Sequence, residues 1–308
     1  MDLKNKQILV TGGNGFLGKN LVKKLGELDV RDVFAPSSQE FDLRKQQDCQ
    51  KIVKNIDVIF HLAGNSGGIG YMGKNPASVF YDNVMMSTQL LHEAKNENIE
   101  KFVGLGTVCS YPKFASIPFS EDEIWDGFPD ESNAPYGISK KIMLTQSDAY
   151  RQQFGFNSIT VIPTNVYGPG DNFHIETSGV IPGIISKIFN AIKTNSNEII
   201  LWGDGKATRD FLYVDDVSYG MILAAEKYDK PSPINLGAEH EITIKELAMM
   251  ISKIMQFSGE IKWDSSKVNG QPRRCVSNDK AEREIGFKPK TNLNQGLEKM
   301  IAWFESNN

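Results

Sequence analysis

A tyrosine and a lysine four residues apart are the chain's clearest candidates for proton transfer. Tyr136 and Lys140 lie in the segment Tyr136-Gly-Ile-Ser-Lys140, and on a helix this spacing puts both side chains on one face. Because a cation beside a phenol lowers the pKa of the phenol, we expect Tyr136 to exchange a proton near neutral pH. Thr107 follows an apolar run ending at Gly106, where its hydroxyl can bind a substrate oxygen. The pair alone is common on helix surfaces, so its meaning depends on the surrounding elements.

A glycine-rich turn follows the first expected strand, Gln7-Ile-Leu-Val-Thr11. Gly12, Gly15 and Gly18 come next and open a helix. Glycines at this spacing permit a tight turn, let backbone N–H groups approach a pyrophosphate and let the helix pack against the strand. The helix N-terminus then favours the anion. An ordinary strand–helix turn is the alternative interpretation, but the position at the first junction of a βαβ unit favours dinucleotide binding.

The residues after the second expected strand bear on which dinucleotide binds. An acidic side chain there would bind the ribose 2′-hydroxyl of NAD. The sequence Ala35-Pro-Ser-Ser-Gln-Glu40 has no acid directly at the strand end. It offers the hydroxyls of Ser37 and Ser38, which can bind a 2′-phosphate, although no arginine stands beside them. The sequence therefore favours NADP(H) over NAD.

Strand and helix signals alternate through the first half of the chain. Apolar runs at 33–35, 57–63, 101–106 and 158–163 predict buried strands, with helices expected at 18–25, 83–94 and 139–154. This rhythm predicts a Rossmann-type, doubly wound parallel sheet with helices on both faces. The stretch 166–209 is rich in Gly, Asn, Pro and Asp. We expect a nucleotide-binding domain of residues 1–165 plus about 210–235, and a smaller, discontinuous α/β substrate domain of about 166–209 plus 236–308.

Composition excludes several classes of protein. The chain has 34 basic and 38 acidic residues, a net charge of −4, and 40% hydrophobic residues, which is typical of a globular protein rather than a disordered one. It lacks the basic excess of a nucleic-acid binder, an apolar run of the ~20 residues that span a bilayer, and a signal-peptide pattern at its start. Three scattered cysteines suit neither a disulfide framework nor a zinc site. We expect a metal-free, cytoplasmic protein without nucleic-acid or membrane partners.

Taken together, these motifs resemble the extended short-chain dehydrogenase/reductase family over essentially the whole chain. Within it, the sequence is most similar to the branch of GDP-L-fucose synthases. The segments that carry the resemblance are Leu105-Gly-Thr-Val-Cys-Ser-Tyr-Pro112, Pro163-Thr-Asn-Val-Tyr-Gly-Pro-Gly-Asp-Asn-Phe-His174, Val180-Ile-Pro182, Trp202-Gly-Asp-Gly205, Arg209-Asp-Phe211 and Gly270-Gln-Pro-Arg273.

The resemblance implies a reductive triad of Thr107, Tyr136 and Lys140, with NADPH delivering hydride to C4 of a GDP-linked keto sugar. The cofactor contacts that it implies are Gly12, Asn14, Gly15, Phe16, Leu17, Gly18, Ser37, Ser38, Leu62, Ala63, Gly64, Leu105, Gly106, Pro163, Thr164, Asn165 and Val166. The substrate contacts are Asn165, Lys187, Trp202, Arg209 and Asn269. An indole can stack and a guanidinium can pair with phosphate; alternatively, Trp202 is a core residue and Arg209 a surface ion-pair partner.

One position departs from the pattern of this branch. The resemblance implies that the full reaction of this branch first inverts the configuration of the sugar at C3 and C5, the two carbons beside the C4 ketone. A cysteine and a histidine carry out this proton removal and return. Cys109 matches the cysteine, but Gly179 stands before Val180 where the histidine should be. His174 belongs to another part of the motif, His61 and His92 fall in a strand and a helix, and nothing places His240 near the sugar. We therefore expect C4 reduction of a GDP-4-keto-6-deoxy hexose or heptose with weak or no epimerisation, leaving Cys109 as a relic or packing residue.

Four other functions are alternatives for this sequence. A bifunctional 3,5-epimerase/4-reductase requires a relocated acid. A 4,6-dehydratase needs Asp and Glu directly after Thr107, where Val108 and Cys109 stand. A 4-epimerase would hold NAD permanently, and a non-catalytic NADP-sensing protein has no need of the Tyr136–Lys140 pair.

The resemblance also implies a homodimer, formed through the helices after Asn83 and around Tyr136.

Overall fold

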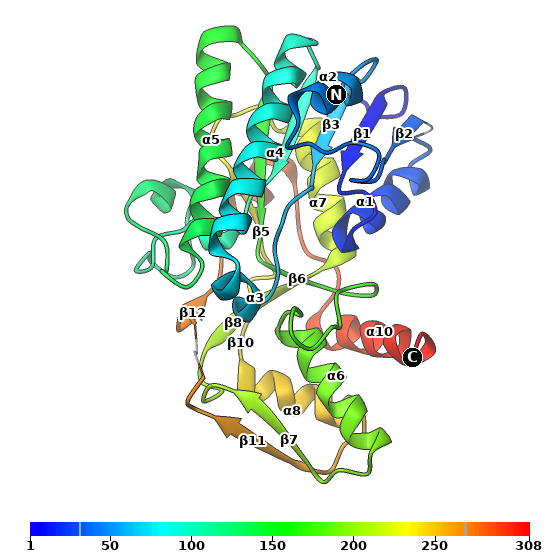
Figure 1. Ribbon diagram of the computed structural model, residues 1–308, viewed down its shortest axis with the longest axis vertical. Coiled ribbons are helices and arrows are strands. Elements are labelled where there is room, and N and C mark those ends of the chain that lie inside the picture. The colour runs from blue at the N-terminus through cyan, green and yellow to red at the C-terminus, as the bar shows by residue number, and fades with distance from the viewer. Residues whose placement is uncertain (31, 268–269) are drawn as a thin grey trace.

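Six parallel strands form the sheet on which the first half of the chain is built (Figure 1). The computed structural model describes residues 1–30, 32–267 and 270–308. The strands lie in the order β2-β1-β3-β4-β5-β9, which confirms the doubly wound Rossmann-type fold. Their bounds are Asp32–Phe34, Gln7–Thr11, Val58–His61, Lys101–Leu105, Ser158–Pro163 and Ile234–Leu236. Because β2 and β3 flank β1, the strand order reverses there, and such a reversal opens a ligand crevice at the carboxyl ends.

Helices cover both faces of this sheet, so its central strands are nearly all apolar. On one face α2 (Gln46–Ile52), α4 (Pro76–Asn96) and α5 (Ala134–Phe154) share a core with Ile59 and Phe102. On the other face α1 (Phe16–Glu27), α7 (Val214–Lys227) and α9 (Asp279–Ile285) pack against Val10 and Val161. Both α4 and α5 begin earlier than expected from the sequence, each with a proline in its first turn, where its missing N–H has no partner to lose.

A second region lies beyond the carboxyl ends of the sheet, with α3 (Ile69–Lys74) at the boundary (Figure 1). Its sheets join β6, β8, β10 and β12, and β7 with β11. The strand bounds are Asn165–Tyr167, Thr208–Tyr213, Glu241–Thr243, Arg273–Arg274, Glu198–Trp202 and Glu260–Asp264. Around them pack α6 (Val180–Lys193), α8 (Ile244–Ile254) and α10 (Leu293–Ser306). Two short 3-10 helices, η1 (Val108–Ser110) and η2 (Glu121–Trp125), follow β4.

Two elements lie apart from where the expected domain division puts them. Strand β8 pairs with β6, β10 and β12 rather than with the six-stranded sheet, although its residues 210–213 fall within the segment of about 210–235 assigned to the first domain. Helix α9 contributes Ala281 and Ile285 to the core of the six-stranded sheet, although 236–308 was assigned to the second. The division into domains stays a prediction, with these two elements exchanged.

Helix α8 begins with a capping box. Thr243 accepts a hydrogen bond from the backbone N–H of Glu246 at 3.1 Å, and the Glu246 carboxylate accepts one from the backbone N–H of Thr243, also at 3.1 Å. This reciprocal pair satisfies two donors at the helix start. Within residues 1–30, 32–267 and 270–308, no helix is both long and apolar enough to cross a membrane.

Candidate active site

The glycine turn after β1 forms a cradle with no room for side chains. Gly12 has a φ of +70°, and a Cβ there would lie 2.7 Å from the backbone nitrogen of Ala63. A Cβ on Gly18 would lie 2.1 Å from the carbonyl oxygen of Gly12. The first turn of α1 carries no acidic residue, and its N-cap is Gly15. These features fit a dinucleotide, because its pyrophosphate needs a close backbone approach and the free N–H groups of a helix start.

The other predicted cofactor residues gather at the same edge of the sheet. Leu62, Ala63 and Gly64 follow β3. They lie beside the glycine turn, because the backbone atoms of Leu62 and Ala63 are the ones that a Cβ on Gly12 would contact. The hydroxyl of Thr11 contacts the buried ring of His61, Oγ1 to Nδ1 at 2.8 Å. The remaining predicted residues end β4 and β5 or begin β6, namely Leu105, Gly106, Pro163, Thr164, Asn165 and Val166.

The end of β2 differs from its expected chemistry. Sequence reading places no acid at this strand end, but the chain folds the carboxylate of Glu40 back onto Ser37. Its Oε2 accepts hydrogen bonds from both the backbone N–H and the hydroxyl of Ser37, each at 2.8 Å. These bonds hold the pKa of Glu40 below its usual value. The Ser37 donors expected for a 2′-phosphate are therefore taken by an anion of the protein itself, while Ser38 has no part in this contact.

Tyr136 sits at the start of α5, beside Thr107. Burial raises the pKa of Tyr136 above its usual value, and the nearby Cys109 raises it further. Hydrogen bonds with Ser66 and Thr107 lower this pKa but do not offset the burial. The sequence predicted a lowered pKa for Tyr136, and the structure shows a raised one. Desolvation of the phenolate is the largest effect on this pKa, and the ammonium of Lys140 is not among its causes. Sequence reading missed Ser66, whose only signal is a polar position shortly after β3.

Lys140, one helical turn after Tyr136, is 2% exposed. Burial lowers its pKa to about 8, because the charged ammonium loses its hydration. Gly64, shortly after β3, passes close to Lys140. A Cβ on Gly64 would lie 3.7 Å from the Lys140 Nζ and only 3.0 Å from the Asn83 Oδ1, so a glycine is needed at this position. The Asn83 amide in turn donates to the backbone carbonyls of Asn65 and Val79, at 2.7 Å each. Thr107 and Lys140 are thus buried beside half-buried Tyr136, an arrangement that can hold charge and transfer a proton.

Cys109 contacts a residue that the sequence analysis missed. Its Sγ accepts a hydrogen bond from Nη1 of Arg274 at 3.6 Å. Arg274 pairs in register with Arg209 on the neighbouring strand β8, and the two are 8% and 9% exposed. Burial and the charge of Arg274 lower the pKa of Arg209 to about 10. Within the described residues neither guanidinium forms an ion pair with a carboxylate, so two buried cations remain available to an anion.

The other predicted substrate residues lie on the second region's elements. Lys187 on α6 donates from Nζ to the carbonyl of Ile200 at 2.7 Å, and the indole of Trp202 is 54% exposed. Asn165 donates from its amide to the carbonyl of Asp210 at 2.8 Å, beside Arg209. The predicted substrate residue Asn269 lies outside the described residues.

Position 179 has space for a side chain that the residue lacks. Gly179 precedes α6 with an ordinary φ of −71°, and a Cβ there would meet only the Pro182 ring, at 4.0 Å. The chain's four histidines stand at other positions. His61 is fully buried, and burial lowers its pKa to about 3; His92 contacts Tyr150 between α4 and α5. His174 and His240 are exposed.

Comparison with known proteins agrees with this geometry. The model of the NAD-dependent epimerase/dehydratase family matches residues 8–237, which include the glycine cradle and the Tyr136–Lys140 pair. The chain belongs to this family. It is 34% identical to the probable GDP-L-fucose synthase 1 of Oryza sativa subsp. japonica, over 99% of this chain and 93% of the relative.

Two solved structures of the same architecture come from Campylobacter jejuni. A GDP-6-OMe-4-keto-L-xylo-heptose reductase superposes with a TM-score of 0.93 at 25% identity, covering 100% of this chain and 99% of that one. A GDP-mannoheptose C4 reductase with NADP bound superposes with a TM-score of 0.88 at 26% identity, covering 99% of each chain. The sequence resemblance to this family and to the GDP-L-fucose synthase branch is thereby confirmed.

The burial of Lys140 predicts an alkaline limit on cofactor use. Its ammonium is present below a pH of about 8 and is lost as the pH rises through that value. We expect kcat/KM for NADPH, which reports the free enzyme, to fall with a midpoint near that pH. The K140R variant keeps its charge and serves as the control, since its profile should lose this limb. An unchanged limb in K140R would contradict the assignment.

The contact between Ser37 and Glu40 predicts a second effect on cofactor binding. Replacing Glu40 with Gln removes a negative charge from the place expected for the 2′-phosphate. We expect KM for NADPH to fall several-fold and KM for NADH to change little, measured by steady-state kinetics at low and high salt. Equal changes for both cofactors would show that the 2′-phosphate binds elsewhere.

Proposed function

We propose that this protein reduces the C4 ketone of a GDP-4-keto-6-deoxy sugar, a hexose or a heptose, with NADPH and without inverting C3 or C5. The observation that supports it most directly is the group of half-buried Tyr136 with buried Thr107 and Lys140 at the carboxyl edge of the sheet, together with a glycine at position 179. The chain is an NADP-dependent oxidoreductase. The Gly12–Gly18 cradle, the edge residues after β3, β4 and β5, and Lys140 are the residues that would hold the dinucleotide.

When bound, the nicotinamide supplies hydride to the carbonyl carbon at C4. The chain's part is to polarise the carbonyl oxygen and to give it a proton. Thr107 and Tyr136 donate hydrogen bonds to that oxygen, and Tyr136 then transfers its phenolic proton to it, so the ketone becomes an alcohol. A raised pKa of Tyr136 suits this role, because the phenol stays protonated until negative charge develops on the C4 oxygen. The tyrosinate is reprotonated from solvent.

Arg209 and Arg274 provide the charge that a GDP-sugar requires. Two buried guanidiniums side by side repel each other, and a diphosphate between them would relieve this by charge-assisted hydrogen bonds. We assign Arg274, as well as the Arg209 of the sequence prediction, to the diphosphate or to the adjacent sugar oxygens. Trp202, exposed on β7 near α3, is the stacking surface for the nucleoside.

The absence of a side chain at position 179 is the reason to propose reduction without inversion. Inversion needs one group to remove a proton and another to return it on the opposite face of the sugar ring. Cys109 offers one such group, held by Arg274 at 3.6 Å; Gly179 offers none. The same Cys109–Arg274 contact is what favours the second candidate, a bifunctional epimerase/reductase in which solvent returns the proton.

Removing the phenolic hydroxyl tests the reductase assignment. We expect Tyr136→Phe to lower kcat by about 10²–10⁴-fold while NADPH binding, followed by fluorescence, changes little. The substrate is GDP-4-keto-6-deoxymannose or its heptose homologue, and turnover is followed by NADPH oxidation at 340 nm. An unchanged kcat, or no turnover of either sugar by wild-type protein that binds NADPH, would contradict the proposed function.

Restoring the missing side chain tests the account of inversion. Position 179 has an ordinary φ and open space around its Cβ, so Gly179→His should fold normally. We expect the variant to release a product inverted at C3, C5 or both, whereas Gly179→Ala, the matched control, gives the wild-type product. The configuration is determined by NMR coupling constants. Inversion already present in the wild-type product would overturn the account.

We also propose that the protein is a cytoplasmic homodimer. An apolar hollow on the outer faces of α4 and α5 is lined by Pro76, Ala77, Phe80, Phe128, Ala134, Pro135 and Ile138. Phe80 and Phe128 are 36% and 65% exposed there, an apolar patch that suits a second copy of the chain. Light scattering after size-exclusion chromatography should give a dimer for wild type and a monomer for Phe128→Glu; a monomeric wild type would refute the dimer.

A further inference from the structure

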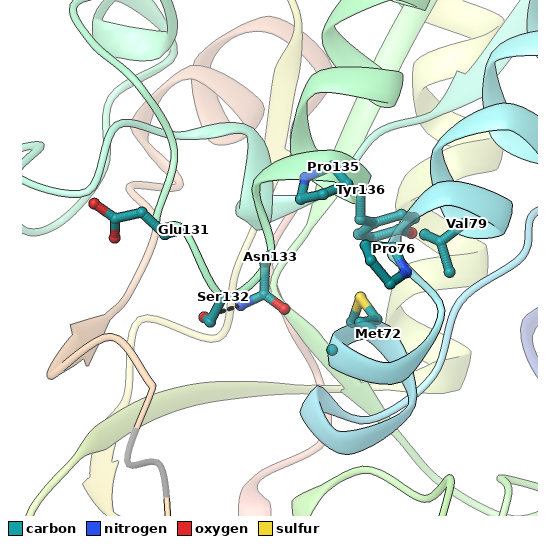
Figure 2. Close-up of a pocket in the computed structure, with 9 residues that line it drawn as sticks. Met72, Pro76, Val79, Glu131, Ser132, Asn133, Pro135 and Tyr136 are labelled. Carbon is teal, nitrogen blue, oxygen red and sulfur yellow. Dashed lines mark hydrogen bonds between the residues drawn. The ribbon is translucent and has the colours of Figure 1, made fainter.

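A cavity of about 230 Å³ lies beside the ring of the proposed proton donor, Tyr136. It forms where α3 and the start of α4 face the segment that leads into α5 (Figure 2). One part of its wall is apolar and the other polar. The apolar residues are Met72, Pro76, Val79 and Pro135, and the polar ones are Glu131, Ser132 and Asn133.

Asn133 supplies this cavity with an unused acceptor. It is the N-cap residue of α5, where an asparagine oxygen commonly accepts a hydrogen bond from the first helical turn. Here the side chain makes no capping bond; its Nδ2 donates to the Ser132 hydroxyl at 3.0 Å instead. No hydrogen bond between described residues reaches its Oδ1, and Figure 2 shows this oxygen turned away from Ser132, toward the side of the cavity where Met72 lies. The residue is only 6% exposed, so its amide is held in place.

Sugar geometry says which part of a substrate comes here. In the proposed reaction C4 lies at the Tyr136 hydroxyl, and the nucleotide is attached at C1, across the ring. The exocyclic arm hangs from C5, the carbon next to the reacting one. It therefore stays within a few bond lengths of Tyr136, and the cavity lined by that tyrosine is space it can enter.

The size and chemistry of the cavity indicate a long arm. A 6-deoxyhexose presents only a methyl group, similar in volume to the ~30 Å³ share of one water molecule. In this cavity a methyl group would leave most of the apolar wall without contacts. An arm of two carbons ending in a hydroxyl would pack its methylene against Val79 and Met72. Its hydroxyl would reach the free oxygen of Asn133.

We propose that this cavity is the subsite for the exocyclic arm at C5, built for an arm longer than a methyl, so that the preferred substrate is a GDP-linked 4-keto heptose. This rests on the proposed function and narrows it from a hexose or heptose to a heptose.

Two variants probe the cavity without disturbing the reacting groups. Asn133→Ala removes the acceptor and, since the side chain does not cap α5, leaves the helix start as it is. Gly73→Leu adds bulk to the cavity wall, where a Cβ meets nothing within 4 Å. Asn294→Ala, in which the exposed α10 residue that pairs with Glu298 is changed, is the matched control.

The readout is the ratio of kcat/KM for GDP-4-keto-6-deoxyheptose to that for GDP-4-keto-6-deoxymannose, by NADPH oxidation. We expect a ratio of about 10 or more in wild type and Asn294→Ala, falling toward 1 in both cavity variants. A merely structural role for these residues would lower both rates and leave the ratio. A wild-type ratio of 1 or less, or a ratio that the variants do not move, overturns the subsite while the reductase function stands. Turnover of neither sugar overturns the proposed function, and the subsite with it.

Discussion

The site depends on how closely the turn after β1 approaches the end of β3. A Cβ at Gly12 would lie 2.7 Å from the backbone of Ala63, so any side chain at this position would force the two strand ends apart. In the segment that follows Ala63, Gly64 lies close to Lys140 and Ser66 forms a hydrogen bond with Tyr136. Because β3 pairs in parallel with β4, the same register sets where Thr107 leaves the sheet. One backbone contact thus positions both the glycine turn and the segment that reaches Tyr136.

Burial controls the protonation states at the reacting end. Desolvation penalises charge, so it raises the pKa of the Tyr136 phenol and lowers that of the Lys140 ammonium to about 8. A simple pairing of cation and phenol predicts a lowered tyrosine pKa, which is wrong for this structure. The raised value is the more useful one for a reductase, because the group must arrive protonated. Arg209 and Arg274 show the opposite charge imbalance: they are two buried guanidiniums with no carboxylate partner among the described residues, which is why we propose that they meet an anionic ligand.

Features set by local spacing were predictable from the sequence. The tight glycine turn after β1 and the placement of Tyr136 and Lys140 one helical turn apart each depend on a single strand–helix junction or a single turn of helix. The alternation of apolar strands and helices likewise predicted the parallel sheet. The pairing of strand β8 with β6, β10 and β12 was not predictable, because a short apolar run does not indicate which sheet it joins.

Residues brought in by tertiary folding were not predictable. Arg274 follows the recognised segment ending at Arg273, and only the alternation of a strand separates its buried side chain from the exposed neighbour. Glu40 reaches Ser37 through a turn that no motif announces. Asn133 lies before the helix expected at 139–154, and only the structure shows it as the N-cap residue of α5 with its side chain at the cavity. In each case the partner lies outside the pattern that first attracts attention.

The central claim is that this site reduces C4 and leaves C3 and C5 untouched. One reaction in D₂O tests it most directly, with wild-type protein, NADPH and a GDP-4-keto sugar that the protein turns over, the product being analysed by NMR. The account predicts ordinary hydrogen at C4, no deuterium at C3 or C5, and unchanged configuration at both. Deuterium at C3 or C5 together with inversion would contradict it, and would mean that a proton donor other than residue 179 serves the opposite face of the sugar.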